Sequence, residues 1–124
     1  MAAVDSSTLI AYLQGKRDIK VERFDAALAT ATVKVPPAVI VEVLCHPNLP
    51  QAHIDLINAL PMLDILPGFW HRAAEMRRGL LSRGLRARLS DTLIAQSCID
   101  HDESLIASNG DFRHFARHCG LKLV

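Results

Sequence analysis

The stretch AAVDSSTLIAYLQG, residues 2–15, decides the fold of this 124-residue chain. Three apolar residues lead to Asp5, after which Ser6 or Ser7 provides a cap for a helix whose apolar residues recur at helical spacing as far as Gly15. The stretch therefore predicts a strand that passes directly into an amphipathic helix, with a carboxylate at the junction.

The rest of the chain repeats this alternation of strands and helices. Strands are expected at residues 32–35, 62–67, 104–108 and 121–124; helices are expected at residues 19–30, 36–44, 69–84, 91–100 and 110–118, and within 47–61. Ser90 is the expected cap of the helix over residues 91–100. Strands that are repeatedly separated by helices indicate an α/β fold, a three-layer α/β/α sandwich around a central, mostly parallel sheet.

Length and composition favour one small cytoplasmic domain over residues 1–124. Half of the residues are apolar, which is enough to build a core. The sequence has no apolar run long enough to span a membrane, and its start lacks the basic flank and long apolar run of a secretory signal. Its three cysteines are widely spaced, a pattern typical of reduced thiols. We therefore expect a soluble protein without membrane contact.

Four acidic residues lie where a parallel sheet gathers its functional groups. Asp5 and Asp111 come just after expected strands, Asp91 opens a helix, and Glu42 lies inside the helix that follows residues 32–35. Residues that follow parallel strands converge in one crevice at the carboxyl edge of the sheet. Grouped carboxylates repel one another unless a hard cation such as Mg²⁺ or Mn²⁺ lies between them. Such a cation can activate water against a phosphodiester.

Each acid also has a structural interpretation. Asp91 and Asp111 at helix starts are typical of caps. Glu42 is a lone charge in a stretch that otherwise reads as buried, and Asp5 follows a strand expected to be central, so an unpaired carboxylate at either position is costly. A serine nucleophile at Ser6 is discounted because no Gly-x-Ser-x-Gly elbow surrounds it.

Positive charge is concentrated in one segment. The chain has a net charge of +1, but residues 72–88 contain six arginines and one glutamate, so this segment carries +5 and the remainder −4. A basic segment opposite an acidic remainder can position phosphates; a solvated helix face is the alternative. The six arginines are Arg72, Arg77, Arg78, Arg83, Arg86 and Arg88.

Three segments together resemble the PIN-domain family, and most closely its VapC-type toxins. VDSSTLIAYLQG (4–15) is similar to the family's opening, PPAVIVEVL (36–44) to its acidic helix, and LSDTLIAQSCIDHDESLIASNGDF (89–112) to its third segment. The resemblance covers essentially the whole chain and implies a PIN-like α/β/α sandwich.

The resemblance also implies the composition of the site. Its metal-binding and catalytic acids fall on Asp5, Glu42 and Asp91, with Ser6 as a supporting polar group. Asn109 stands where the family often has an aspartate, whereas Asp111 matches a second acid that some members carry. Either the neutral oxygen of Asn109 completes the metal site, or Asp111 supplies the charged fourth ligand.

The implied activity is that of a Mg²⁺- or Mn²⁺-dependent endoribonuclease, the toxin of a toxin–antitoxin pair, which inhibits translation. The implied partners are RNA, a cognate antitoxin and a second copy of the chain. The candidate RNA-binding residues are Arg72, Arg77, Arg78, Arg83 and Arg86, and their contribution should be salt-sensitive. The alternatives are a PIN nuclease that processes RNA without being a toxin, and an inactive PIN-like module that binds RNA or protein.

Two further motifs have alternative interpretations. His114 and His118 have the i, i+4 spacing of zinc ligands, although a solvated helix face is the simpler interpretation. Phe69 and Trp70 can stack on bases, but at helical spacing they are more typical of a core or a dimer interface.

Overall fold

A small parallel sheet organises the molecule, and its central strand is the one that begins the chain. The computed structural model describes residues 1–107 and 110–124. Strand β1 (Ala2–Val4) lies between β2 (Val33–Lys34) and β3 (Ser104–Ile106), and both pairings are parallel. The residues in register are Ala2 with Val33 and Ser104, Ala3 with Lys34 and Leu105, and Val4 with Ile106. Ala3 and Val4 are fully buried, as expected for a central parallel strand.

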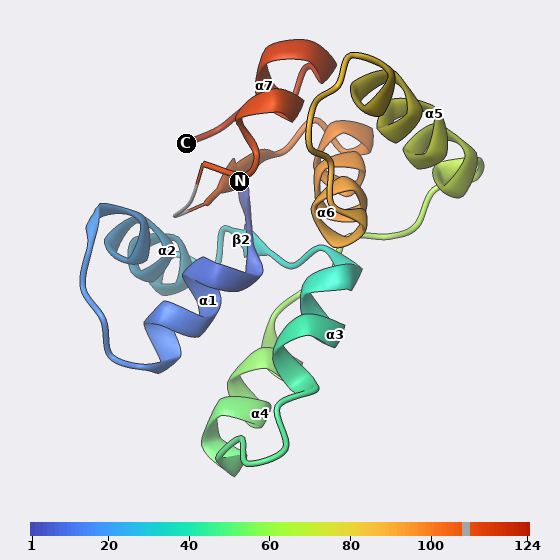
Figure 1. Ribbon diagram of the computed structural model, residues 1–124. Coiled ribbons are helices and arrows are strands. Elements are labelled where there is room, and N and C mark those ends of the chain that lie inside the picture. Colours follow the sequence, from blue (N-terminus) through green and yellow to red (C-terminus); the bar gives the residue numbers. More distant parts are fainter. Residues whose placement is uncertain (108–109) are drawn as a thin grey trace.

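Helices cover both faces of this sheet, which confirms the predicted α/β architecture. They are α1 (Ser6–Leu13), α2 (Ile19–Ala29), α3 (Pro37–Leu44), α4 (Gln51–Ala59), α5 (Phe69–Ser82), α6 (Leu89–Asp100) and α7 (Arg113–Cys119). Figure 1 shows α1 and α2 on one side of the sheet and α5 and α6 on the other, while α3 and α4 extend away from it. In the described part of the chain, no helix is long and apolar enough to cross a membrane.

Two expected strands are reduced to single bridges. Residues 62–67 contribute only the bridge between Met62 and Val35, and residues 121–124 only the bridge between Leu123 and Leu105. After Met62 the chain turns away from the sheet edge: the carbonyl of Asp64 bonds to the His101 ring instead of a strand. The prediction of full strands was wrong at both edges because alternating apolar residues pack against the core without completing a hydrogen-bonded ladder.

The helix caps also differ from expectation. The cap of α1 is Asp5 and neither Ser6 nor Ser7, because the Asp5 carboxylate accepts a hydrogen bond from the Thr8 amide. Helix α6 begins at Leu89 with Arg88 at the cap position, so the expected cap Ser90 lies within the first turn. Both helices therefore start one or more residues earlier than the sequence predicted.

Candidate active site

Asp5 is held in place by the junction between β1 and α1. Its side chain is only 1% exposed, and its two oxygens accept hydrogen bonds from the Thr8 amide (2.9 Å) and the Ser7 hydroxyl (2.8 Å). Burial raises the pKa of Asp5, the hydrogen bonds from Thr8 and Ser7 oppose this increase, and the charge of Glu42 adds to it. The strand-to-helix turn thus fixes a desolvated carboxylate at the edge of the sheet.

A hydrogen bond from the start of α1 links Glu42 of α3 to the neighbourhood of Asp5. Ser6, the first residue of α1, donates a hydrogen bond from Oγ to Oε1 of Glu42 at 2.5 Å. The stretch around Glu42 is less buried than expected: Val39 and Val43 are buried, but Val41 is 69% exposed. The reason is helical geometry, since residues 39 and 43 share the core-facing side of α3 and residue 41 lies on the opposite side.

Asp91 lies in the first turn of α6, where it is neither the helix cap nor fully solvated. Burial raises the pKa of Asp91 to about 6, and the charge of Asp111 contributes the next largest increase. The guanidinium of Arg88 lowers this pKa, whereas the charges of Glu42 and Asp5 raise it further. The structure therefore brings all four predicted acids into one electrostatically coupled group.

Asp111 lies at the entrance to α7 and faces Arg88, with 3.5 Å between Oδ2 and Nη1. The cap position of α7 is Phe112, which makes no side-chain cap bond. The other candidate for the fourth ligand, Asn109, lies outside the described residues.

The donor chemistry of this group fits a hard divalent cation. Carboxylate oxygens are the ligands that Mg²⁺ and Mn²⁺ prefer, and a cation removes the repulsion that raises the Asp91 pKa. The buried hydroxyl of Thr8, next to Asp5, has no hydrogen-bond partner among the described residues and offers a further polar atom. Within residues 1–107 and 110–124, however, no three His, Cys, Asp or Glu side chains are already arranged to hold a metal.

Two of the five candidate RNA-binding arginines bond to other parts of the protein. Arg72 forms two hydrogen bonds with Asp100 of α6 (3.0 and 2.6 Å) and a third with the carbonyl of Pro67 (2.7 Å). Arg77 donates to the carbonyl of Ala87 at 2.8 Å. These bonds tie α5 to its neighbours, so both guanidinium groups are already used in tertiary structure.

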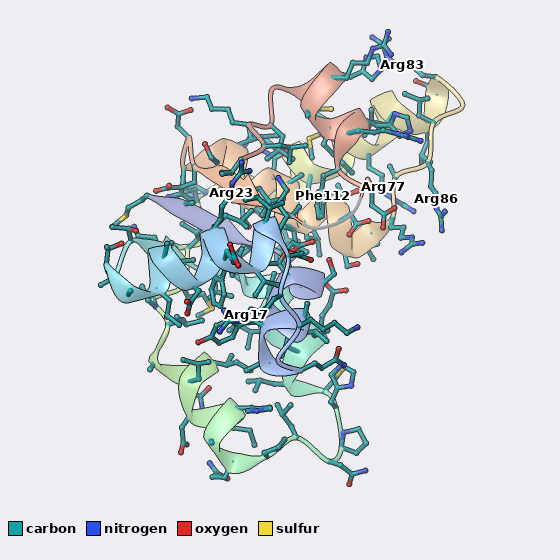
Figure 2. The ribbon with its side chains drawn as sticks, turned by 90° about the vertical axis from the view of Figure 1, so that its left-hand side faces the viewer. Arg17, Arg23, Arg77, Arg83, Arg86 and Phe112 are labelled. Carbon is teal, nitrogen blue, oxygen red and sulfur yellow. The ribbon has the colours of Figure 1, made fainter. Side chains whose placement is uncertain are left out.

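The remaining arginines of the basic segment are exposed. Arg78 lies on α5, and Arg83 and Arg86 lie in the connection to α6. Figure 2 shows Arg83 and Arg86 at one edge of the molecule, away from Arg17 and Arg23, with Phe112 between the two groups. Arg86 of the connection between α5 and α6 lines a cavity together with Arg113 and His114 at the start of α7.

A small cavity beside the acids contains residues that the sequence analysis did not connect with the site. It measures about 160 Å³ and is lined by Arg86, Arg88, Asp91, Gly110, Asp111, Arg113 and His114. The overlooked residues are Arg113 and His114, and the available signal was their position directly after Asp111 and Phe112. No zinc cluster forms around His114 and His118 in the described part of the chain.

An apolar face adjoins the opposite side of the site. Phe69 is in the core (2% exposed), but Trp70 is 62% exposed and packs edge-on against Phe69. Two cavities, of about 320 and 700 Å³, lie on either side of Trp70 and share the lining residue Leu89, and the smaller one reaches Glu42. Of the two interpretations that the sequence favoured, core packing therefore holds for Phe69, and the exposed Trp70 leaves the dimer interface as the prediction for its side chain.

The parallel sheet with carboxylates at its edge is accompanied by a family match across nearly the whole chain. Residues 2–118 match the PIN domain model, and the chain belongs to the PIN domain family. Among solved structures, it is similar to a chain of the crystal structure of VapBC2 from Rickettsia felis bound to a DNA fragment from their promoter. The two chains are 17% identical with a TM-score of 0.77, over 99% of this chain and 96% of the other. No curated protein sequence matches significantly.

Proposed function

We propose that this protein is a Mg²⁺- or Mn²⁺-dependent endoribonuclease and the toxin of a VapBC-type toxin–antitoxin pair, which inhibits translation by cutting RNA. The observation that carries this proposal is the electrostatic coupling of Asp91 to Asp5, Glu42 and Asp111 in a chain with the PIN fold. Similarity to a chain of a VapBC2 structure supports the toxin assignment at the level of the fold.

Each residue of the site has a distinct role in this proposal. Asp5 and Asp91 are the direct ligands of the cation, which supplies an activated water and charge neutralisation when it is bound. The Thr8 amide and the Ser7 hydroxyl keep the Asp5 carboxylate oriented before the cation arrives. Ser6 holds Glu42 so that its second oxygen remains available to the cation or to its water.

Asp111 completes the carboxylate group from the other side. The ion pair between Asp111 and Arg88 keeps Asp111 near Asp91. Of the neighbouring charges, that of Asp111 raises the pKa of Asp91 most, so these two carboxylates gain most from a bound cation. RNA brings its own negative charge to this position, so the cation and the nearby arginines must balance both carboxylates and phosphate.

We also propose two protein partners, a cognate antitoxin that blocks the site and a second copy of this chain. The face around Trp70 and Leu89 favours the second copy, since it is apolar at its centre and oppositely charged at its ends. Glu42 lies at one end, and the exposed Arg78 lies at the other. A two-fold interface sets the acidic end of one copy against the basic end of the other.

The test of the enzymatic proposal is cleavage of total cellular RNA by the purified protein with Mg²⁺ or Mn²⁺. We expect discrete fragments that disappear with EDTA and in Asp5→Ala and Asp91→Ala. The matched control is Asp102→Asn, because Asp102 is an exposed carboxylate paired with Lys122 away from the site, and its positive φ is a conformation that asparagine tolerates.

Each alternative predicts a different combination of RNA cleavage, binding and growth inhibition. Cleavage that survives both active-site substitutions contradicts the proposed site. If the wild type cleaves nothing but binds RNA or a partner protein, the chain is a binding module. If it cleaves RNA without slowing growth when expressed alone, the nuclease assignment stands and the toxin assignment fails.

A further inference from the structure

We propose that the cavity between the start of α6 and the start of α7 is a binding pocket for a backbone phosphate of RNA, with Arg86 and Arg113 as its phosphate-contacting residues. This inference rests on the proposed nuclease function and adds residues to its substrate site. Arg86 belongs to the basic segment at residues 72–88, whereas Arg113 of α7 lies outside it.

The position of the cavity is the first argument. The cavity is lined by Asp91 and Asp111, which belong to the candidate metal site, and also by Arg86, Arg88, Arg113 and His114. A group bound there lies directly beside the carboxylates. Arginines that contact the RNA backbone position the strand and neutralise its phosphates, and the exposed arginines of this lining can do so beside the carboxylates.

The second argument is the difference between the arginines around the site. Arg88 pairs with Asp111, Arg72 with Asp100, and Arg77 with a backbone carbonyl. In contrast, the guanidinium group of neither Arg86 nor Arg113 forms a hydrogen bond or ion pair with another described residue, and the backbone amide of Arg113 bonds to the Gly110 carbonyl. Both are exposed, so their guanidinium groups can form the bidentate contacts that phosphate oxygens favour.

The third argument is the rigidity of the support under Arg113. The preceding residue, Phe112, is 1% exposed and lies near Phe115, with 6.2 Å between the ring centroids. This packing anchors the start of α7 in the core, and Arg113 begins the helix immediately afterwards. In Figure 2, Phe112 lies among the packed elements while Arg86 projects from the edge of the molecule. A phosphate is thus held between a fixed helix start and a residue of the α5–α6 connection.

The experiment measures binding of a fluorescent single-stranded RNA oligonucleotide in EDTA, which prevents cleavage, over a series of NaCl concentrations. The variants are Arg86→Gln, Arg113→Gln and the double variant. The matched control is Arg23→Gln, an exposed arginine of α2 that lies on another part of the molecule in Figure 2. Since all three positions are exposed, unchanged melting temperatures should confirm that the variants fold.

We expect Arg86→Gln and Arg113→Gln each to weaken RNA binding. Each phosphate contact that is lost from a single strand should reduce the slope of log K against log salt by about 0.7, so the double variant should lose about 1.4. Arg23→Gln should leave the slope unchanged. In cleavage with Mn²⁺, the same variants should raise KM several-fold while kcat stays within about twofold, because the contacts serve binding more than chemistry.

If Arg86→Gln and Arg113→Gln keep the wild-type salt slope of RNA binding, or if Arg23→Gln reduces that slope equally, the phosphate pocket is contradicted. The nuclease proposal would remain intact in either case. Reduced slopes in a protein that cuts no RNA with any metal would support the pocket and contradict the nuclease. A wild type that does not bind RNA even at low salt contradicts both.

Discussion

Ser6 and Glu42 are 36 positions apart in the chain, yet the hydroxyl of Ser6 lies 2.5 Å from Oε1 of Glu42. This hydrogen bond connects the start of α1 to the middle of α3. Because Ser6 directly follows Asp5, the bond also sets the position of one candidate catalytic carboxylate relative to another. A hydroxyl that donates to a carboxylate leaves the second carboxylate oxygen available for a cation.

Replacement of Ser6 by alanine tests this relationship. We expect Ser6→Ala to reduce kcat by about tenfold, since Glu42 loses its orientation, and to cost about 1–2 kcal/mol of stability, as a partly buried hydrogen bond to a charged group does. Ser6→Thr keeps the hydroxyl and should retain most activity. The control is Ser82→Ala, which removes only an exposed bond to a backbone carbonyl. Full activity in Ser6→Ala would show that Glu42 needs no such support.

The raised pKa of Asp91 predicts how stability depends on pH. Between its ordinary value of 3.8 and its folded value of about 6, the folded protein holds a proton that the unfolded chain has released. Stability of the metal-free protein therefore falls as pH rises through this window. Asp91→Asn removes the penalty, and we expect it to be more stable than wild type by about 1–2 kcal/mol at pH 7.5, a figure reduced for partial exposure.

Thermal denaturation in EDTA at two pH values measures this effect. The melting temperature of Asp91→Asn should exceed that of the wild type at pH 7.5, and the difference should vanish below about pH 3, where Asp91 is protonated in both states. The same difference at both pH values would mean that the substitution acts through packing and that charge is not the cause.

Addition of Mn²⁺ should reverse the order of these stabilities. A ligand that binds only the folded state stabilises it by about 2.7 kcal/mol at one hundred times its Kd. We expect Mn²⁺ to raise the melting temperature of the wild type at pH 7.5 and to have little effect on Asp5→Asn or Asp91→Asn. An equal increase in Asp102→Asn and wild type is the matched control. If Mn²⁺ shifts neither protein, the site is not a divalent-cation site and the binding-module alternative gains support.

The ion pair between Arg72 and Asp100 predicts a structural effect that is separate from RNA binding. Burial raises the pKa of Asp100, but the hydrogen bonds from Arg72 and Gln96 outweigh it and hold this pKa below its ordinary value. The pair therefore stabilises the folded protein at pH values above the ordinary pKa of aspartate. This contribution is lost as the pH falls through the lowered pKa that Asp100 has in the folded protein. We expect Arg72→Gln to lower the melting temperature at pH 7 because the Asp100 side chain, 7% exposed, loses its cation.

The comparison variant is Arg83→Gln, an exposed arginine at the C-terminal end of the same helix. It should melt like the wild type. The RNA-binding slope of Arg72→Gln should remain that of the wild type at temperatures where the variant is folded. A reduced slope with unchanged melting would place Arg72 in the RNA-binding surface as the sequence predicted.

The exposed Trp70 predicts the position of the dimer interface. We expect the wild type to be a dimer by light scattering coupled to gel filtration and Trp70→Ala to be a monomer, because an aromatic residue at the centre of an apolar face contributes most of such an interface. Ile19→Ala removes an equally exposed apolar residue from α2 and should leave the dimer intact. A wild type that is monomeric at every concentration, or a dimeric Trp70→Ala, contradicts this assignment.

Much of the fold was predictable because its signals are local. The passage from β1 to α1 at Asp5 needs only three apolar residues, a capping group and helical periodicity, all within residues 2–15. The parallel order of the sheet follows from the alternation of strands and helices. The convergence of Asp5, Glu42 and Asp91 follows in turn from the position of each acid relative to its strand or helix.

The errors arose where the outcome depends on neighbours that are distant in sequence. An alternating segment such as residues 62–67 becomes a strand only if an adjacent strand offers its backbone groups along the whole length, and here only Val35 does so. Periodicity likewise left open whether Phe69 and Trp70 pack in the core or at an interface, and only the structure shows that Phe69 is buried and Trp70 exposed. The roles of Arg72 and Arg77 depend on Asp100 and on the Ala87 carbonyl, which no local pattern identifies.

The sequence by itself thus determined the order of elements, the parallel sheet and the acids at its edge, because these depend on side-chain periodicity and on backbone geometry within a few residues. Only the tertiary structure decided which polar group holds each acid, which arginines remain available for a substrate, and that Arg113 of α7 lies beside Asp91. Those relationships are set by contacts between segments that fold together in space, and the free energy of such contacts depends on both partners at once.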